Sequence, residues 1–408
     1  MSDIKHFLDE AEALLPAAID LRRDIHREPE LGLHNPLTTR KVLNALEGLD
    51  VTINTGPSTS GLMISMEGRK KGTQGGRTIL LRGDTDALPM SEETGLPYAS
   101  EIEGRMHACG HDAHTAMLVQ AAHLLHAHRD EFAGTVKFMF QPGEEGYQGA
   151  RFMIDDGLVD GGIKPDGAFA LHITPNFAAG SIIGKPGAMM ASADVWKIKI
   201  KGKGGHASMP HMAVDPIPVA FEIGLALQQM VTRRIDAFDP VVLTCTKVRA
   251  GTTDNVIPET ADMLGTVRAC SEAARRLAHQ GIERVAQNIA AAHLCEVTVE
   301  IEEGYPVTVN DATFVDFARG VVNDLIGEDR YIARTAPVMG AEDFSYVLQR
   351  IPGCMMFLGT MPKDHHGHAH VAPCHSNHMI LNEESMAVGI ALHAAIAWRF
   401  LETGMMPA

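Results

Sequence analysis

The stretch MHACGHDAH (106–114) places a thiol, three imidazoles and a carboxylate within nine positions. Cys109 and His111 stand on either side of a glycine, whose backbone freedom lets both side chains converge on one cation. Thiolate and imidazole are the ligands that zinc and similar metals prefer. A packed core does not favour such a cluster, because each buried polar group without a partner costs about 1–3 kcal/mol. The spacing therefore predicts a metal site, with Asp112 and His114 orienting the ligands from behind.

Two pairs of carboxylates follow apolar, β-rich runs and are further candidates. Glu144 and Glu145 follow VKFMF, and neighbouring side chains of an extended chain point in opposite directions. One of them can therefore ligate a metal while the other acts as a general base; two exposed glutamates in a turn are the alternative. Asp84 and Asp86 follow TILL on one face of the predicted strand. One of these would hold a histidine ligand from behind, and the alternative is a solvated strand end.

Single histidines complete the candidate set. His172 ends the apolar run in FALHITP, and His375 lies in PCHSNH. Each of them alone is more often a core or surface histidine than a ligand, but metal sites assemble from segments that are distant in sequence. The run HHGHAH (365–370) is either a solvated loop or a weak additional metal site.

The composition favours a globular protein that acts on a small solute. The chain has 408 residues, of which 45% are hydrophobic, enough for two or three domains. A net charge of -16 argues against nucleic acid and anionic membranes as partners. No run approaches about eighteen apolar residues, and the N-terminus is acidic and amphipathic, which predicts a cytoplasmic protein. The six dispersed cysteines lack the density of a disulfide framework, so we expect most of them to be reduced and buried.

The pattern of elements predicts an α/β fold with one insertion. A helix over 3–28 is followed by short β-rich runs that alternate with helical patterns, as in an α/β sheet domain. From about 188 the order becomes β-α-β-β-α-β, which is typical of a ferredoxin-like unit. The predicted domains are a catalytic domain over 1–187 and 304–408 and an inserted domain over 188–303. The polar clusters follow apolar runs, which places them at the strand ends where open sheets bind ligands.

Seven motifs occur in a fixed order: HACGHDAH, QPGEEG, LHITP, GKPGAMMAS, KGGHAS, NVIP followed by GTVR, and GAEDFS. Together they resemble the M20 metallopeptidase family, and most closely its aminoacylase-like amidohydrolase branch, which includes hippurate hydrolases and auxin-conjugate hydrolases. The likeness runs from HREPELG to the final helix, nearly the whole chain. It implies a catalytic α/β domain that binds two divalent metal ions, and an inserted lid domain that commonly mediates dimerisation.

The resemblance also implies roles for single residues. Glu144 matches the general base, which would move a proton from the attacking water to the leaving amine, and Asp86 matches the aspartate behind the ligands. In the lid, His206 matches a histidine, often from the partner subunit, that polarises the scissile carbonyl. Asn255 and Arg268 match positions that hold the substrate carboxylate, and GAEDFS, with Gly340 and Glu342, resembles the loop that lines the pocket. The residues that match the metal ligands are Cys109, His111, Glu145, His172 and His375.

The leading hypothesis is a metal-dependent amidohydrolase that cleaves N-acyl amino acids, hippurate-like or N-acetylated, into a carboxylic acid and an amino acid. Zinc, manganese, cobalt or nickel would fit the ligand set, and the lid would form a homodimer or a homotetramer. A dipeptidase or aminopeptidase of the same family is one alternative, and it would need a pocket for a free amino group. A non-catalytic metal-binding subunit is another, against which the intact pair of Glu144 and Glu145 argues. The sequence departs from the family pattern around Asp84 and after His375, which affects the rim of the pocket.

Overall fold

The computed structural model describes residues 4–70, 76–363 and 371–405, and the run 365–370 therefore lies outside the described residues. Contacts between Cα atoms divide the chain into two compact units. The first unit comprises Met1–Met189, Val309–Ala336 and Tyr346–Ala408, and the second comprises Met190–Thr308 and Pro337–Ser345. The sequence analysis assigned the last of these segments to the returning part of the catalytic domain, whereas its contacts group it with the inserted unit.

The first unit is built on an eight-stranded mixed sheet. In spatial order its strands are β1 (Thr52–Thr55), β2 (Leu62–Glu67), β4 (Thr135–Gln141), β3 (Thr78–Asp84), β5 (Gly167–Thr174), β16 (Gly353–Gly359), β6 (Ile182–Gly184) and β15 (Tyr331–Ala333). The four central strands β4, β3, β5 and β16 run parallel to one another. Every residue of β3, β4 and β16 is buried, because parallel strands in an α/β fold are covered on both faces. The predicted α/β sheet is confirmed.

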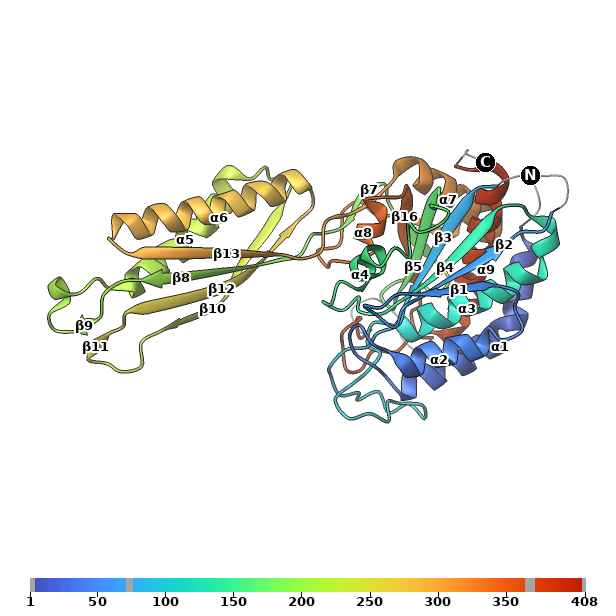
Figure 1. The fold of residues 1–408 in the computed structure, drawn as a ribbon, viewed down its shortest axis with the longest axis horizontal. Coiled ribbons are helices and arrows are strands. Elements are labelled where there is room, and N and C mark those ends of the chain that lie inside the picture. Colours follow the sequence, from blue (N-terminus) through green and yellow to red (C-terminus); the bar gives the residue numbers. More distant parts are fainter. Residues whose placement is uncertain (1–3, 71–75, 364–370, 406–408) are drawn as a thin grey trace. The chain divides into compact units, whose positions relative to one another are not determined.

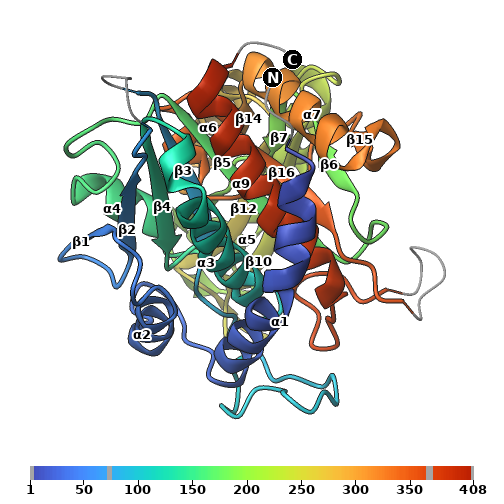
Figure 2. The same ribbon diagram turned by 90° about the vertical axis from the view of Figure 1, so that its right-hand side faces the viewer.

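Helices lie around this sheet, some against its strands and others on neighbouring helices. They are α1 (His6–Arg27), α2 (Pro36–Ala45), α3 (His111–Ala127), α4 (Gly149–Asp155), α7 (Ala312–Ile326), α8 (Ser345–Leu348) and α9 (Met386–Thr403). α3 and α9 lie against the sheet, and α1 packs across both of them (Figure 2). α3 is therefore buried on nearly all sides, as its apolar sequence requires. Among the described residues, none of the helices is both long and apolar enough to span a bilayer.

The second unit contains a four-stranded antiparallel sheet with two helices on one face (Figure 1). Its elements in chain order are β8 (Asp194–Lys201), α5 (Pro216–Arg234), β10 (Val241–Ala250), β12 (Thr260–Ala269), α6 (Glu272–Ala292) and β13 (Glu296–Glu303). The spatial order of the strands is β10-β12-β8-β13, which is that of a ferredoxin-like βαββαβ unit. Trp196, Ile198 and Ile200 of β8 are buried in the core beneath α5 and α6, and the intervening lysines lie on the other face.

Short strands and caps complete the architecture. β9 (Gly205–His206) pairs with β11 (Val256–Ile257), and β7 (Gly187–Met190) pairs with β14 (Thr308–Asn310). α5 begins after Asp215, whose carboxylate accepts the backbone N–H of Ile217 at 2.9 Å. α6 begins after Ser271, whose hydroxyl accepts the backbone N–H of Ala274 at 3.0 Å. Both are the N-cap interactions expected from these residue types.

Candidate metal centre and active site

The loop before α3 depends on Gly110, whose φ of +82° lies in the left-handed region. A Cβ atom at this position would lie 2.4 Å from the Cγ1 atom of Ile173, so a side chain does not fit. The turn makes His111 the first residue of α3 and brings Cys109 Sγ to 3.4 Å from His172 Nε2. Gly110 thus allows its two neighbours to face strand β5.

His172 lies in β5 with hydrogen bonds that suit a metal ligand. Its Nδ1 donates to the carbonyl oxygen of Ile173 at 2.6 Å, which leaves the lone pair of Nε2 beside Cys109. Burial, and then the neighbouring His114, lower the pKa of His172 well below its ordinary value. The imidazole is therefore neutral at physiological pH, which is the form that binds a metal.

The loop after β4 presents two adjacent glutamates that are held by Asp86. The backbone N–H groups of Glu144 and Glu145 donate to the two carboxylate oxygens of Asp86 at 2.9 and 3.0 Å. Asp86 follows β3, which is the neighbour of β4 in the sheet. A residue at the end of β3 therefore holds the loop that follows β4. Asp86 is therefore placed to position both glutamates.

His375 reaches the same place from the C-terminal part of the chain. Its φ of +69° lies in the left-handed region, which costs a residue with a side chain of order 1–3 kcal/mol. The backbone N–H of His375 donates to the carbonyl oxygen of Ala108 at 2.8 Å, and its Nε2 lies 3.2 Å from Glu145 Oε1. This strained turn joins the last candidate ligand to the loop that carries Cys109.

The structure brings the five residues proposed as ligands together. Three groups of donor atoms each lie within 4.8 Å of one another: Cys109 with His111 and His172, Cys109 with Glu145 and His375, and His111 with Glu144 and Glu145. The Cys109 thiol belongs to two of these groups, and so does the His111 imidazole. An arrangement in which one sulfur atom is shared by two ligand groups is suited to two ions on either side of it.

His111 has the surroundings expected at a cation site. Both of its ring nitrogens are buried, and within the described part of the chain neither has a hydrogen-bond partner. Burial alone would lower the pKa of His111, but nearby carboxylates, chiefly Asp84 and Asp86, outweigh it and raise the pKa to about 10. The same carboxylates would stabilise a metal cation in place of the proton. The sulfur, nitrogen and oxygen donors fit zinc and similar divalent metals.

Behind these residues, His114 and Asp84 form a fixed pair. His114 Nε2 accepts the backbone N–H of Ile173 at 2.8 Å, so its Nδ1 carries the proton and donates to Asp84 Oδ1 at 2.6 Å. Asp84, His111 and His114 also bring donor atoms within 4.8 Å of one another. Since both nitrogens of His114 are already engaged, we interpret His114 as a support for strand β5 and Asp84. Arg82 lies 2.6 Å from Asp84 and completes this support.

A buried network that the sequence analysis did not identify lies next to His111. Asp112 Oδ2 accepts a hydrogen bond from His26 Nδ1 at 2.8 Å and lies 3.0 Å from Arg22 Nε. His26 Nε2 lies 3.1 Å from Glu92 Oε2. Arg22 and His26 are four residues apart on one face of α1, and this spacing was the available signal. The network ties the first helix to the start of α3.

In the second unit, the structure places His206 beside Asn255. His206 lies in β9 and is exposed, and its Nδ1 accepts the backbone N–H of Ser208 at 3.1 Å. The neutral ring therefore carries its proton on Nε2, where it is a potential donor. β9 pairs with β11, and the backbone N–H of Ala207 donates to the carbonyl oxygen of Asn255 at 3.1 Å.

Arg268 is not brought to Asn255 within one chain. The ten residues of β12, from Thr260 to Ala269, span about 30 Å. Asn255 directly precedes β11, which comes before the N-terminal end of β12 in the chain (Figure 1). Arg268 is the second-last residue of β12. The resemblance assigned both residues to the substrate carboxylate, but Asn255 and Arg268 of one chain are too far apart to bind the same carboxylate.

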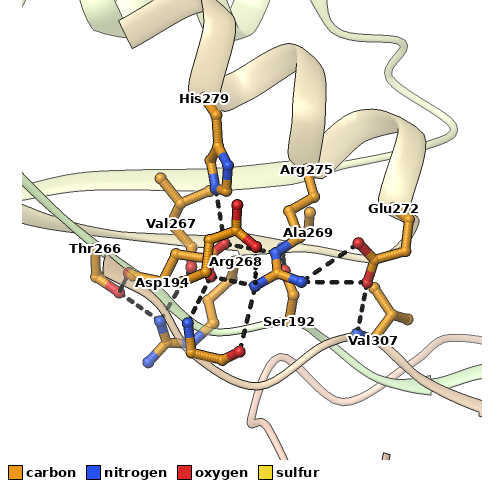
Figure 3. A network of polar contacts seen from close by, with 12 residues as sticks. Ser192, Asp194, Thr266, Val267, Arg268, Ala269, Glu272, Arg275, His279 and Val307 are labelled. Carbon is orange, nitrogen blue, oxygen red and sulfur yellow. Dashed lines mark hydrogen bonds and ion pairs between the residues drawn. The ribbon is translucent and has the colours of Figure 1, made fainter. Parts of the chain in front are cut away.

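Arg268 lies instead beside a buried polar network of the second unit (Figure 3). There Asp194 accepts hydrogen bonds from Arg275 at 2.9 and 2.6 Å and from His279 at 2.9 Å. Arg268 donates to the hydroxyl of Thr266, but among the described residues it has no carboxylate partner. A partly buried guanidinium that forms no direct ion pair is suited to bind an anionic group.

Gly340 and Glu342 lie in the segment Pro337–Ser345 of the second unit. The carbonyl oxygen of Gly340 accepts the backbone N–H of Ala191 at 2.9 Å, so this segment runs beside the start of the inserted unit. Glu342 is buried, and its Oε1 accepts the backbone N–H of Phe344 at 2.9 Å. In this structure the Glu342 carboxylate stabilises the loop itself.

Comparison with known proteins shows the family of this chain. The sequence profile of Peptidase family M20/M25/M40 matches residues 80–399. The chain belongs to this family. Its relatives include Thermostable carboxypeptidase 1 of Saccharolobus solfataricus, 36% identical over 94% of this chain and 95% of the relative. IAA-amino acid hydrolase ILR1-like 4 of Arabidopsis thaliana is 38% identical over 94% and 85%. N-acetylcysteine deacetylase of Bacillus subtilis is 38% identical over 94% and 97%.

A solved M20 structure is also similar along the whole chain. The YXEP protein of Bacillus subtilis, described as a dinuclear metal binding peptidase from the M20 family, aligns with a TM-score of 0.81 and 35% identity over 96% of this chain and 99% of that one. The amide-cleaving relatives confirm the predicted aminoacylase-like amidohydrolase branch. This M20 protein is therefore a hydrolase that acts on amide bonds.

Proposed function

We propose that this hydrolase is a metal-dependent amidohydrolase that releases an amino acid from N-acyl amino acids, with hippurate-like and N-acetylated compounds as the substrate class. The observation that carries the proposal is the pair of adjacent glutamates held by Asp86. Glu145 lies 3.2 Å from His375 in a group with Cys109, while Glu144 lies in the neighbouring group with His111. One carboxylate can therefore bind a metal while its neighbour remains available to move a proton.

Two divalent ions per chain are part of the proposal. Cys109 would be shared between them, and the other proposed ligands are His111, Glu145, His172 and His375. Zinc, manganese, cobalt and nickel all accept such a donor set. Ions bound there would polarise the scissile carbonyl and lower the pKa of the attacking water.

The remaining steps are assigned to side chains. Glu144 would take a proton from the attacking water and deliver it to the nitrogen of the leaving amino acid. His206 would donate a hydrogen bond from Nε2 to the oxygen on which negative charge develops. Arg268 would hold the carboxylate of the amino acid, since its guanidinium has no carboxylate partner among the described residues.

The positions of His206, Asn255 and Arg268 support an assembly of at least two chains. His206 and Asn255 lie with the β9–β11 pair and Arg268 lies at the other end of β12. If all three serve one substrate, His206 and Asn255 must come from one chain and Arg268 from another. We therefore propose a homodimer or a homotetramer. We also propose that the protein acts in the cytoplasm.

A substrate comparison tests the proposal. The purified protein would be assayed with N-benzoylglycine, N-acetyl amino acids and matching unblocked dipeptides, after chelation and after return of each metal. We expect hydrolysis of the acylated compounds that chelation abolishes and metal restores. The 36% identity to a carboxypeptidase favours a peptidase as the second candidate, and preference for an unblocked dipeptide would support it. Metal binding without turnover of any of these compounds would support a non-catalytic subunit.

A further inference from the structure

A second group of potential metal ligands lies at the far end of α3 from His111. His6 and Glu10 are four residues apart on α1, so they lie on the same face of that helix, and His128 directly follows the last residue of α3. Donor atoms of these three side chains lie within 4.8 Å of one another. The 17 residues of α3 span about 25 Å, which separates this group from the metal centre proposed above.

His128 has the environment of a metal-binding imidazole. Its Nε2 lies 2.8 Å from Glu10 Oε2, and its Nδ1 lies 2.9 Å from Glu131 Oε1 on the opposite side of the ring. Histidine ligands usually have a carboxylate at one ring nitrogen, which orients the ring so that the other nitrogen faces the metal. The ring also packs edge-on against Phe7 and Trp398, with centroids 5.4 and 6.0 Å away, so its orientation is fixed.

His6 provides an imidazole that is available for binding. Neither of its nitrogens is hydrogen-bonded within the residues that the structure describes. Its ring lies 5.2 Å from the ring of His128 and 4.2 Å from that of Phe7. A half-exposed imidazole beside a second imidazole and a carboxylate can share one cation with them at little cost.

The charges around this group favour a cation. Burial alone would lower the pKa of His128, but the carboxylates of Glu10 and Glu131 outweigh it and raise the pKa. His128 also caps the C-terminus of α3, where the helix dipole stabilises positive charge. Without a metal, a proton between Glu10 and His128 satisfies both side chains. A divalent ion would replace that proton and neutralise the carboxylate more completely.

We propose that His6, Glu10 and His128 form an additional site for a divalent transition metal, best suited to zinc, which ties the start of α1 to the end of α3. Two imidazoles and one carboxylate are a common ligand set for zinc with an open fourth position. A tetrahedral ion with ligand bonds of about 2.0–2.1 Å separates its donor atoms by about 3.3 Å, so Glu10 and His128 need to move apart only slightly. The site is independent of the proposed catalytic function.

Zinc binding to the enzyme with its metal centre already filled tests this site. Crystals of the metal-loaded protein would be soaked in zinc chloride, and anomalous scattering would be measured on both sides of the zinc absorption edge. We expect a peak between His6, Glu10 and His128. The absence of this peak at zinc concentrations that saturate binding in solution would overturn the proposal. A peak at the segment 364–370 in its place would overturn it as well.

Matched variants provide a test in solution. His6→Ala and Glu10→Gln remove ligands from partly exposed positions, whereas His126→Ala removes an imidazole from the same end of α3 that lies outside the ligand group. For the metal-loaded protein we expect a chelator competition to give at least tenfold weaker binding of the additional zinc in the first two variants and unchanged binding in the third. Zinc should also raise the midpoint of thermal unfolding in the parent and in His126→Ala, but not in His6→Ala. An equal shift in all three would contradict the proposal.

Discussion

Arg22 lies 3.0 Å from Asp112, and both side chains are almost completely buried. Burial would raise the pKa of Asp112, but Arg22 and then His26 outweigh this effect and hold the pKa well below its usual range. Asp112 is therefore a buried anion whose stability depends on α1. Because Asp112 follows His111, this ion pair couples the packing of the first helix to the position of a proposed metal ligand.

Replacing Arg22 by methionine should destabilise the fold strongly. The variant removes the main counter-charge of the buried Asp112 carboxylate, which costs about 3–5 kcal/mol. Urea unfolding would measure this loss. Arg23→Met is the matched control. Arg23 is 38% exposed, and its partner Glu383 still forms an ion pair with Arg22 in this variant. We therefore expect a loss of about 1 kcal/mol or less. Similar losses for the two variants would contradict the role given to the buried pair.

The two adjacent glutamates should respond differently to the same substitution. Glu144→Gln should retain bound metal and lose turnover by about 100-fold to 10,000-fold, because it removes a general base but no proposed ligand. Glu145→Gln should lose metal together with activity, because it weakens a proposed ligand. Metal analysis and initial rates on N-acyl amino acids would be measured on the same samples. Near-normal turnover of Glu144→Gln would refute the proposed mechanism.

Asp194 should make the second unit sensitive to acid. Burial alone would raise the pKa of Asp194, but His279 and Arg275 outweigh it and lower the pKa to about 2. In the unfolded chain an aspartate has a pKa of about 3.9, so this stabilisation is complete above about pH 4 and is lost as the pH falls towards 2. After allowance for solvent screening it is of order 1–2 kcal/mol.

The measurement for Asp194 is the free energy of unfolding as a function of pH. Between pH 5 and 3 it should fall more steeply for the parent than for Asp194→Asn, because the amide has no proton to gain. Asp262→Asn changes an exposed aspartate of the same sheet and should leave the slope as it is in the parent. A parent-like slope in Asp194→Asn would show that other groups cause the acid sensitivity.

His206→Ala should reduce turnover by about 100-fold with the fold intact, as expected for the loss of a hydrogen-bond donor to the developing oxyanion. His206 is exposed, so its removal should not change the unfolding midpoint. His211→Ala removes another exposed histidine of the second unit and serves as the control. If both variants retained full activity, the second unit would have no part in the chemistry.

Most of the fold and many of the proposed site residues could be predicted from local sequence patterns. The apolar runs TILL and VKFMF and the β-α-β-β-α-β order were visible because strand and helix periodicity are local properties of the sequence. Asp86 and the two glutamates follow strand ends as expected, and the structure brings the donor atoms of Cys109, His111 and Glu145 close together. Gly110 was a readable signal, because a glycine between two candidate ligands permits the left-handed conformation that the structure shows.

Long-range pairs could not be predicted in this way. Arg22 and Asp112 are charged residues in helices, and helical periodicity predicts that such residues lie on the solvent-exposed face. Their burial results from the packing of α1 on α3, which periodicity alone does not specify. The separation of Asn255 from Arg268 also became visible only with the register of β12, because motif order carries no distances.

The inserted unit leaves and re-enters its surroundings at neighbouring points, since the first residue of β8, Asp194, pairs with the last residue of β13, Glu303. A segment whose two ends lie side by side can be replaced by another segment through recombination. The domain that receives it needs to accommodate only two neighbouring chain ends. Recombination at this junction would give the same eight-stranded sheet a different inserted unit, without rebuilding the strands and loops that carry the proposed ligands.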